Sequence, residues 1–158
     1  MACVDKVKPG DTFKVKTNDC FFGQITSEAQ DIHAIDMSKV NPATGPIYVE
    51  GAEQGDLLKV KVLDIEVDSQ GVACILPGEG LLENRVAKPH IRVMPVKDGR
   101  VQFGDLLIPI KPMIGVIGLA PSHAEGEWPT DTPWKHGGNM ETTEIDKGPS
   151  PIHISEPT

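Results

Sequence analysis

The segment from Thr132 to Thr142, TPWKHGGNMET, brings together side chains that can do chemistry. His136 is followed by two glycines, then by Asn139 and, two residues later, by Glu141. An imidazole can move a proton or bind a metal ion near neutral pH, and a side-chain amide both donates and accepts hydrogen bonds. Glycine, here Gly137, lets the backbone approach a ligand closely. The polar surroundings argue against a core histidine, so we predict an active-site loop from Trp134 to Glu141.

A second candidate group stands near the amino terminus, in KTNDCFFGQIT. The Asp19 carboxylate could bind a metal ion or act as a base, although residue type alone favours an aspartate in a turn. Cys20 could be a nucleophile, but the neighbouring carboxylate disfavours the thiolate and no histidine is adjacent in sequence. We therefore expect Cys20 to be a half-buried structural cysteine. The remaining histidines are expected to be exposed to solvent: His33, His90, His123 and His153.

The elements that must position these residues are expected to be strands. A Gly-Asp pair opens three similar segments, GDTFKVKT, GDLLKVKV and GDLLIPIK, and suits a turn because glycine tolerates positive φ and aspartate can bond the nearby backbone. Each pair is followed by a short run of strand-forming residues, and PIYVEG, VACILPG, IRVMPV and MIGVIGLA are further strand candidates. One short helix is expected from Thr26, in TSEAQDIH. The fold class predicted is all-β, a sandwich or jelly-roll-like arrangement with short helices at most.

Domain organisation and charge narrow the classes of function. We expect a single β-rich domain over residues 1–148 and a proline-rich tail over 149–158, because proline lacks the N–H that a central strand donates. The net charge of −8 argues against binding to nucleic acid or to an anionic membrane, since both need a basic face. No apolar run resembles a signal peptide or a membrane span, and the three cysteines form no CxxC pair. These features are typical of a cytoplasmic protein with reduced thiols.

Several motifs, taken in order, resemble the acetamidase/formamidase family. They are TNDCFFGQI, VNPATGPIYVEGAEQGDLLKVKVLDIEV, LPGEG, KPMIGVIGLAP, PTDTPWKHGGNMET and IDKG, and together they extend from about Val7 to about Gly148. The resemblance implies a β-sandwich-type fold, an oligomer, and hydrolysis of formamide, acetamide or similar short amides to a carboxylic acid and ammonia. It also implies a divalent metal such as zinc, which would activate water for attack on the amide.

The same resemblance implies roles for individual residues. Asp19 and His136 correspond to metal or site residues, and His136, Asn139 and Glu141 are the catalytic candidates. Asn139, with Gly137, would contact the amide substrate. Family members commonly carry aspartate where this chain has Glu141, so the longer side chain departs from the family pattern.

Family members are about twice as long as this chain, which suggests two hypotheses. In the first, the chain is an amide hydrolase in which a metal held by Asp19, His136 and further carboxylates activates water, either alone or together with a separate second half. In the second, it is a truncated, non-catalytic homologue that binds a partner subunit or a second copy of itself through exposed strand edges. The partners expected are therefore a small amide and either a homo-oligomer or a complementary carboxyl-terminal half.

Overall fold

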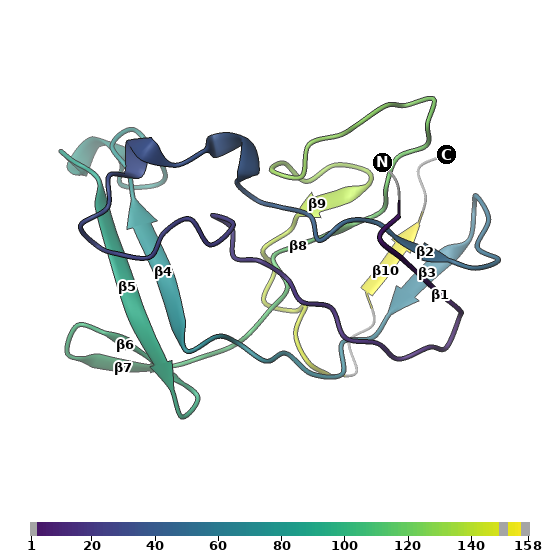
Figure 1. Cartoon of the computed structure of the whole chain (residues 1–158), viewed down its shortest axis with the longest axis horizontal. Helices are drawn as coiled ribbons and strands as arrows, with labels where there is room; N and C mark the ends of the chain where they lie inside the picture. Colours follow the sequence, from purple (N-terminus) through teal and green to yellow (C-terminus); the bar gives the residue numbers. More distant parts are fainter. Residues whose placement is uncertain (1–2, 149–151, 156–158) are drawn as a thin grey trace. The chain divides into compact units, whose positions relative to one another are not determined.

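The computed structural model describes residues 3–148 and 152–155, and within them the chain forms two compact units (Figure 1). Unit 1 comprises residues 1–22, 39–65 and 112–158, and unit 2 comprises residues 23–38 and 66–111. The chain passes from one unit to the other more than once, so neither unit is a continuous stretch of sequence. The expected single domain over residues 1–148 stays a prediction. In the tail, the structure describes only the backbone of Ile152–Ser155, which forms a strand.

The all-β class predicted from the sequence is confirmed, with helix limited to three-residue 3-10 turns. In the described residues these turns are η1 (Ile32–Ala34), η2 (Met37–Lys39) and η3 (Glu83–Arg85). The strands are β1 (Asp5–Val7), β2 (Ile47–Val49), β3 (Leu57–Val60), β4 (Gln70–Ile75), β5 (His90–Lys97), β6 (Arg100–Phe103), β7 (Leu106–Pro109), β8 (Val116–Gly118), β9 (Gly137–Asn139) and β10 (Ile152–Ser155).

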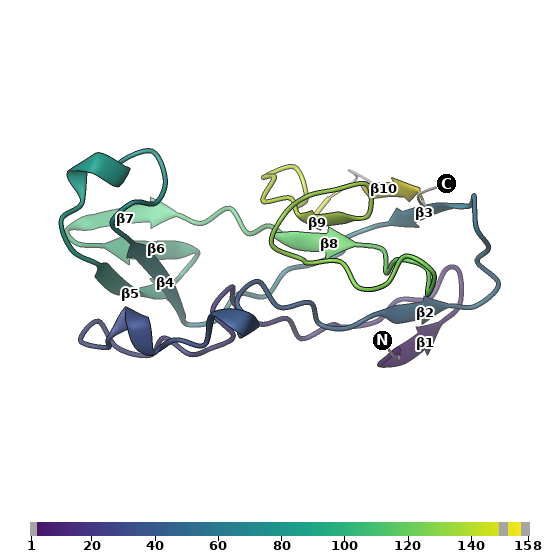
Figure 2. The same ribbon diagram turned by 90° about the horizontal axis from the view of Figure 1, so that it is seen from above.

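Unit 1 is built from three pairs of strands. β1 and β2 are parallel, whereas β3 pairs with β10 and β8 pairs with β9 in antiparallel fashion. Figure 2 shows β8 and β9 beside the long loop that connects them. Short strands of this kind leave much of the unit to loops, and the candidate site residues lie in those loops or at the strand ends.

Unit 2 holds the largest sheet, with the strand order β4-β5-β6-β7. Asp98 and Gly99 both have positive φ, 51° and 70°, and join β5 to β6. Positive φ at both central residues is the requirement of a two-residue hairpin turn whose twist matches that of the strands, and Asp-Gly is well suited to it. β5 is longer than its pairing with β6, which involves only Val96 and Lys97. Outside that pairing, the Glu28 carboxylate accepts a hydrogen bond from the Val93 N–H at 3.0 Å.

The turn interpretation of the Gly-Asp pairs agrees with the structure. Gly10, Gly55 and Gly104 all have positive φ, between 60° and 95°. The Asp11 carboxylate accepts from the Lys8 N–H at 2.8 Å, and the Asp56 carboxylate accepts from the Glu53 N–H at 2.9 Å. The aspartate therefore closes the turn by bonding backbone three residues earlier.

Two local expectations were wrong. The helix expected from Thr26 is absent: the chain forms turns there, and η1 begins only after Asp31, whose carboxylate accepts from the His33 N–H at 2.9 Å. Aspartate and serine compete for backbone hydrogen bonds in this way and favour caps over helix interiors. The segment GDTFKVKT forms no strand either, although it alternates, because propensity forms a strand only where a neighbouring strand can pair with it.

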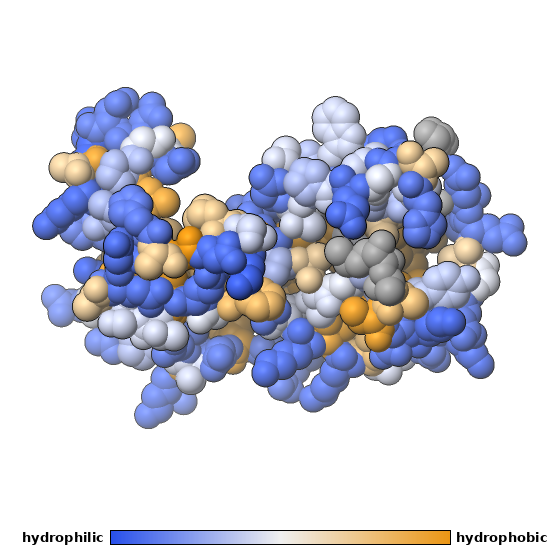
Figure 3. All heavy atoms as spheres, turned by 45° about the horizontal axis from the view of Figure 1, so that its top comes forward, coloured by the Kyte–Doolittle hydropathy of each residue, from blue (hydrophilic) through white to orange (hydrophobic). Residues whose placement is uncertain are grey.

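Buried apolar side chains are few in each unit. In unit 2 the isoleucines Ile25, Ile32 and Ile35 are buried, and in unit 1 Val62 and Ile145 are. The Gln24 side-chain amide closes the loop around the isoleucines with two hydrogen bonds to the backbone of Asp36. Its oxygen accepts from the Asp36 N–H at 2.9 Å, and its nitrogen donates to the Asp36 carbonyl at 3.2 Å. Figure 3 shows hydrophobic residues in patches between hydrophilic ones over the visible face. No helix in the described part of the chain is long and apolar enough to span a membrane.

The backbones of β8 and β9 approach each other closely in unit 1. Gly118 pairs with Gly137, and a Cβ added to Gly118 would lie 2.4 Å from the His136 carbonyl oxygen. A Cβ added to Gly137 would lie 2.4 Å from the Ile117 carbonyl oxygen. These distances are too short for any side chain, so both strands need glycine at the position where Gly118 pairs with Gly137.

We expect Gly118→Ala to destabilise the protein by about 1–3 kcal/mol, since the clash is with backbone that cannot turn away. Gly115→Ala is the matched control in the same unit, because its Cβ would meet only the Glu141 side chain at 3.9 Å. Urea unfolding of the two variants and the wild type measures the difference. Equal midpoints for the two variants would contradict the steric role of Gly118.

Candidate functional site

His136 lies at the tip of a tight turn between the loop and β9. Trp134 and Gly137 exchange two backbone hydrogen bonds, of 2.8 and 2.9 Å, so Lys135 and His136 are the two residues of the turn. The His136 carbonyl accepts from the Leu119 N–H at 2.8 Å, which fastens the turn to the chain after β8. The backbone around His136 is therefore held on both sides by the glycine-dependent pairing of β8 with β9.

The His136 side chain is buried, with only 6% of its surface exposed. This corrects the argument from local polarity, which placed the imidazole outside the core. The ring packs against Trp128 with centroids 5.1 Å apart and planes inclined by 71°, an edge-to-face contact. A Cβ on Gly138 would lie 3.4 Å from the ring atom Nε2 and 2.8 Å from the Thr132 carbonyl oxygen, so glycine there leaves room for the imidazole.

The hydrogen bonding of the imidazole fixes its tautomer. His136 Nε2 lies 3.2 Å from the carbonyl oxygen of Pro129. A carbonyl oxygen can only accept, so Nε2 carries a proton and donates it, and in the neutral ring Nδ1 then keeps a lone pair. Nδ1 is buried and has no hydrogen-bond partner among the described residues. An N–H donated to a backbone carbonyl with the second ring nitrogen left as a lone pair is also the arrangement of a metal-bound histidine.

Asn139 presents a second unpartnered acceptor. It ends β9, and its Oδ1 is buried with no hydrogen-bond partner in the described part of the chain. Leaving a buried acceptor unpaired costs about 1–3 kcal/mol, so such an atom in a folded protein calls for a donor from elsewhere. His136 and Asn139 thus provide two acceptors for a ligand or for additional polypeptide.

Glu141 follows β9 in an unusual backbone conformation. Its φ is +44°, and its own N–H and that of Met140 both donate to the Gly115 carbonyl, at 3.0 and 2.9 Å. Left-handed backbone costs a residue with a Cβ roughly 1–2 kcal/mol, and aspartate or asparagine adopts it more readily than glutamate. The conformation gives a physical reason for the aspartate that relatives were expected to have here. The Glu141 side chain is exposed.

Asp19 occupies a turn, as its residue type suggested. Its carboxylate accepts from the Phe21 N–H at 2.7 Å and its carbonyl from the Phe22 N–H at 3.0 Å. The adjacent Cys20 is exposed, which corrects the expectation of a half-buried side chain. Of the other histidines, His33, His90 and His123 are exposed as expected, and the side chain of His153 lies outside the described residues.

A short chain of hydrogen bonds links the Asp19 turn to the loop of His136. The Asn41 N–H donates to the Cys20 carbonyl at 2.7 Å, and the Asn41 carbonyl accepts from the Thr130 hydroxyl at 2.6 Å. Thr130 follows Pro129, whose carbonyl oxygen accepts the hydrogen bond from the His136 imidazole. The two segments nominated by the sequence therefore meet within unit 1. A direct partnership between Asp19 and His136 stays a prediction.

Three residues that hold the site were missed in the sequence: Trp128, Pro129 and Thr130. The signal that could have identified them is the scarcity of aromatics. The chain has only two tryptophans, and both lie within eight residues of His136, in GEWPTDTPWKH. Asn41, with φ of 53°, was also missed, because a left-handed asparagine in a loop has no distinctive sequence pattern.

Comparison with known proteins decides the family. A family model described as the Acetamidase/Formamidase family matches residues 1–131. The chain belongs to the acetamidase/formamidase family. It is similar to a formamidase from Methylophilus methylotrophus, with 48% identity over 61 residues, 37% of this chain and 15% of that protein.

Two solved structures extend the family likeness over almost the entire chain. A crystal structure of an acetamidase from Bacillus halodurans has a TM-score of 0.92 and 41% identity, over 98% of this chain and 52% of that one. A predicted acetamidase/formamidase from Thermoanaerobacter tengcongensis gives 0.91 and 45%, over 99% and 52%. This member of the acetamidase/formamidase family thus spans about half the length of those relatives.

We expect His136→Ala to lower the free energy of unfolding by about 1–3 kcal/mol, because the substitution leaves a cavity against Trp128 and an unpaired Pro129 carbonyl. Chemical denaturation measures the loss. His123→Ala, an exposed histidine of the same unit, is the matched control and should change stability by no more than about 0.5 kcal/mol. Equal stability of the two variants would show that the imidazole contributes no packing.

Replacing Glu141 tests the backbone conformation that follows β9. Glu141→Asn should raise the free energy of unfolding by up to about 1 kcal/mol, since asparagine tolerates positive φ better. Glu144→Asn, at an exposed residue of ordinary φ, is the control and should bring no gain. Thermal unfolding of both variants gives the comparison, and a loss of stability in Glu141→Asn would mean that the glutamate side chain itself is needed.

Proposed function

We propose that this chain supplies part of the active site of an amide hydrolase that cleaves short aliphatic amides to a carboxylic acid and ammonia. One observation carries the proposal: the His136 side chain is buried, its Nε2 lies 3.2 Å from the Pro129 carbonyl oxygen, and its Nδ1 has no partner among the described residues. The named relatives, a formamidase and acetamidases, support the choice of short amides as substrate.

Hydrolysis of an amide needs a base for the attacking water and an acid for the leaving nitrogen. In the proposed mechanism Nδ1 of His136 accepts a proton from water while the oxygen attacks the carbonyl carbon. The same proton then passes to the nitrogen as the C–N bond breaks, so that one amide and one water give one acid and one ammonia. Oδ1 of Asn139 accepts a hydrogen bond from the substrate N–H and orients the amide.

A divalent metal such as zinc would compete for the same lone pair of His136. Bound there, it would lower the pKa of water and polarise the amide carbonyl. The described residues do not complete such a site: none of their side chains forms a group of three or more histidine, cysteine, aspartate or glutamate residues able to hold a metal ion. Catalytic zinc usually has three protein ligands. Beyond His136 and the proposed Asp19, a metal would need ligands from other polypeptide.

The proposed partner is polypeptide equivalent to the remainder of the solved relatives, or a second copy of this chain. Support comes from the 52% coverage of those relatives and from the apolar surface left open. β7 forms one edge of its sheet, and its residues Leu106, Leu107 and Ile108 are 62%, 60% and 42% exposed. An open apolar edge strand is a template for pairing with further chain.

The second candidate function is a non-catalytic homologue that binds a partner subunit. The absence of a metal-ligating group among the described residues and the open edge of β7 favour it. The two candidates differ in one outcome, ammonia release by the completed assembly.

The test is ammonia release from formamide and acetamide, with and without added zinc. It compares this chain alone with this chain mixed with the complementary half of the Bacillus halodurans acetamidase. We expect hydrolysis in the mixture and a loss of about 100-fold or more in kcat for His136→Gln, the usual range for removing a general acid-base group. His123→Gln should leave the rate unchanged.

Two results would overturn the proposal. An unaltered rate in His136→Gln would remove the imidazole from the reaction. A stable complex of the two polypeptides that releases no ammonia, under conditions where the intact relative does, would favour the non-catalytic function.

A further inference from the structure

We propose that Trp128 is a positioning residue for His136, and that the Lys135–Glu125 ion pair holds Trp128 in place for this purpose. The inference rests on the proposed function in one respect: it takes His136 to be the reacting group. Its test measures the imidazole itself and does not need catalysis.

The imidazole needs a second restraint beyond its hydrogen bond. The bond from Nε2 to the Pro129 carbonyl is its only hydrogen bond to the described residues, because Nδ1 has no partner there. The rotation of a ring about the bond to its Cβ is broad and roughly two-fold, so one hydrogen bond fixes one nitrogen but restrains the ring plane weakly. The edge-to-face contact with Trp128, at 5.1 Å between centroids, restrains the plane.

Trp128 is in turn held by the residue that precedes His136 in the turn. Lys135 Nζ lies 4.7 Å from the Trp128 ring centroid, a cation-π contact. Consecutive side chains of one tight turn, Lys135 and His136, thus both contact the same indole. Any rotation of the indole changes both contacts together.

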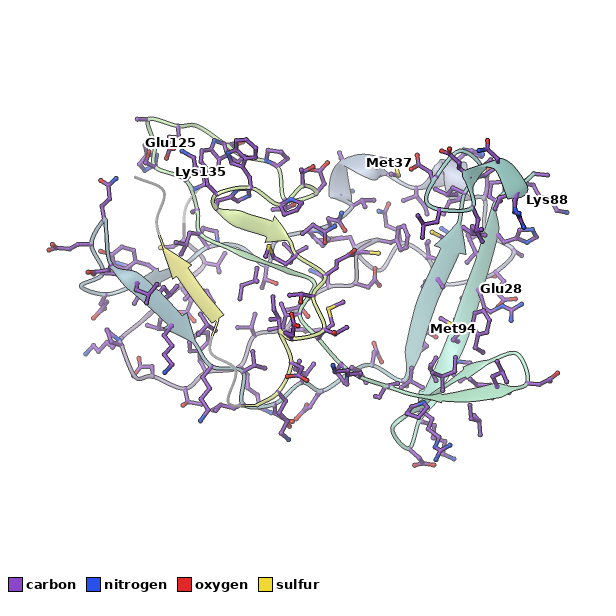
Figure 4. All side chains as sticks on the ribbon, turned by 180° about the vertical axis from the view of Figure 1, so that it is seen from behind. Glu28, Met37, Lys88, Met94, Glu125 and Lys135 are labelled. Carbon is purple, nitrogen blue, oxygen red and sulfur yellow. The ribbon has the colours of Figure 1, made fainter. Side chains whose placement is uncertain are left out.

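Glu125 fixes the ammonium group over the indole. Its carboxylate lies 2.7 Å from Lys135 Nζ and also accepts from the Ser122 hydroxyl at 2.9 Å. Figure 4 shows the labelled Glu125 and Lys135 side by side in the loop before β9. The Lys135 ammonium, and after it the Ser122 hydroxyl, keep the pKa of the Glu125 carboxyl below its usual value. An exposed ion pair adds little stability, so we expect its effect here to be that it holds the Lys135 ammonium over the Trp128 ring.

The backbone makes the same segment stiff. Pro129 has a fixed φ, and the residue before a proline is restricted as well, so Trp128 and Pro129 have few conformations to choose from. Thr130 then anchors the segment, because its hydroxyl donates to the Asn41 carbonyl at 2.6 Å. Three consecutive residues therefore give the imidazole a ring contact, a hydrogen-bond acceptor and a fixed support.

The test is nitrogen-15 NMR of the histidine side chains in the whole chain, with the His136 signals assigned by their loss in His136→Gln. In the wild type we expect one neutral tautomer with the proton on Nε2. The second readout is the exchange rate of that proton with water, relative to the Met140 amide, which donates to the Gly115 carbonyl of the same unit. The ratio separates a local change at the imidazole from general loosening of β9.

Three substitutions distinguish positioning from packing. Trp128→Leu should speed the relative exchange of the imidazole proton about 3- to 10-fold, as expected for losing one aromatic pair, and should shift the tautomer ratio toward Nδ1–H. Trp128→Phe keeps an aromatic ring and should restore the wild-type values. Lys135→Met keeps the apolar stem without the charge and should fall between them. The His123 signals should stay constant throughout.

The proposal fails if the wild-type imidazole populates both tautomers equally, or if Trp128→Leu leaves both its tautomer and its relative exchange rate unchanged. If Trp128→Leu does not fold, Lys135→Met takes its place in the test. A relative exchange rate of the imidazole proton equal to that of the wild type in Lys135→Met would then overturn the proposal. The outcome is separate from that of the proposed function. A correctly positioned imidazole in a complex that hydrolyses no amide would refute the amide hydrolase and leave the role of Trp128 intact.

Discussion

The contact of β8 with β9 at Gly118 and Gly137 is the constraint on which the candidate site depends. Neither strand has room for a side chain where the two glycines pair, since a Cβ on Gly118 would lie 2.4 Å from the His136 carbonyl oxygen and a Cβ on Gly137 would lie 2.4 Å from the Ile117 carbonyl oxygen. That closeness fixes the turn of Lys135 and His136. The two glycines of the His-Gly-Gly-Asn segment therefore allow the backbone to lie close to neighbouring backbone, and Gly138 also leaves space for the imidazole.

A buried imidazole with a single hydrogen bond lowers the stability of the folded chain. Burying a polar nitrogen without a partner costs free energy, and both His136 Nδ1 and Asn139 Oδ1 are buried without one among the described residues. Two unpaired acceptors so close in sequence, next to a residue with a φ of +44°, are the kind of local conflict that proteins keep at functional sites. This pattern connects the packing of unit 1 to the proposed chemistry.

The proposal that additional polypeptide completes the site draws on the surface of the chain as well as on the site itself. Few apolar side chains are buried in either unit, whereas large ones on β7 are exposed. The solved relatives have about as much chain again as the part that matches this one. A domain that buries little apolar surface gains little hydrophobic stabilisation. Packing against another half would cover the open strand edge, and it could bring the donors or ligands that the two acceptors lack.

Sequence by itself determined the fold class, most of the strands, the Gly-Asp turns, the family and the nomination of His136 and Asn139. The family follows from the resemblance of several motifs to known proteins, and the rest follows from local rules: alternation, the conformational freedom of glycine and the type of side chain. The tertiary structure alone decided that His136 is buried, that Nε2 rather than Nδ1 lies against the Pro129 carbonyl, and that Trp128, Pro129 and Thr130 support the ring. It also decided that GDTFKVKT stays irregular and that the segment from Thr26 is not a helix. The physical reason is the same in each case. Burial, tautomer and strand pairing depend on which distant segment of the chain packs against the residue, and a local sequence pattern does not identify that segment.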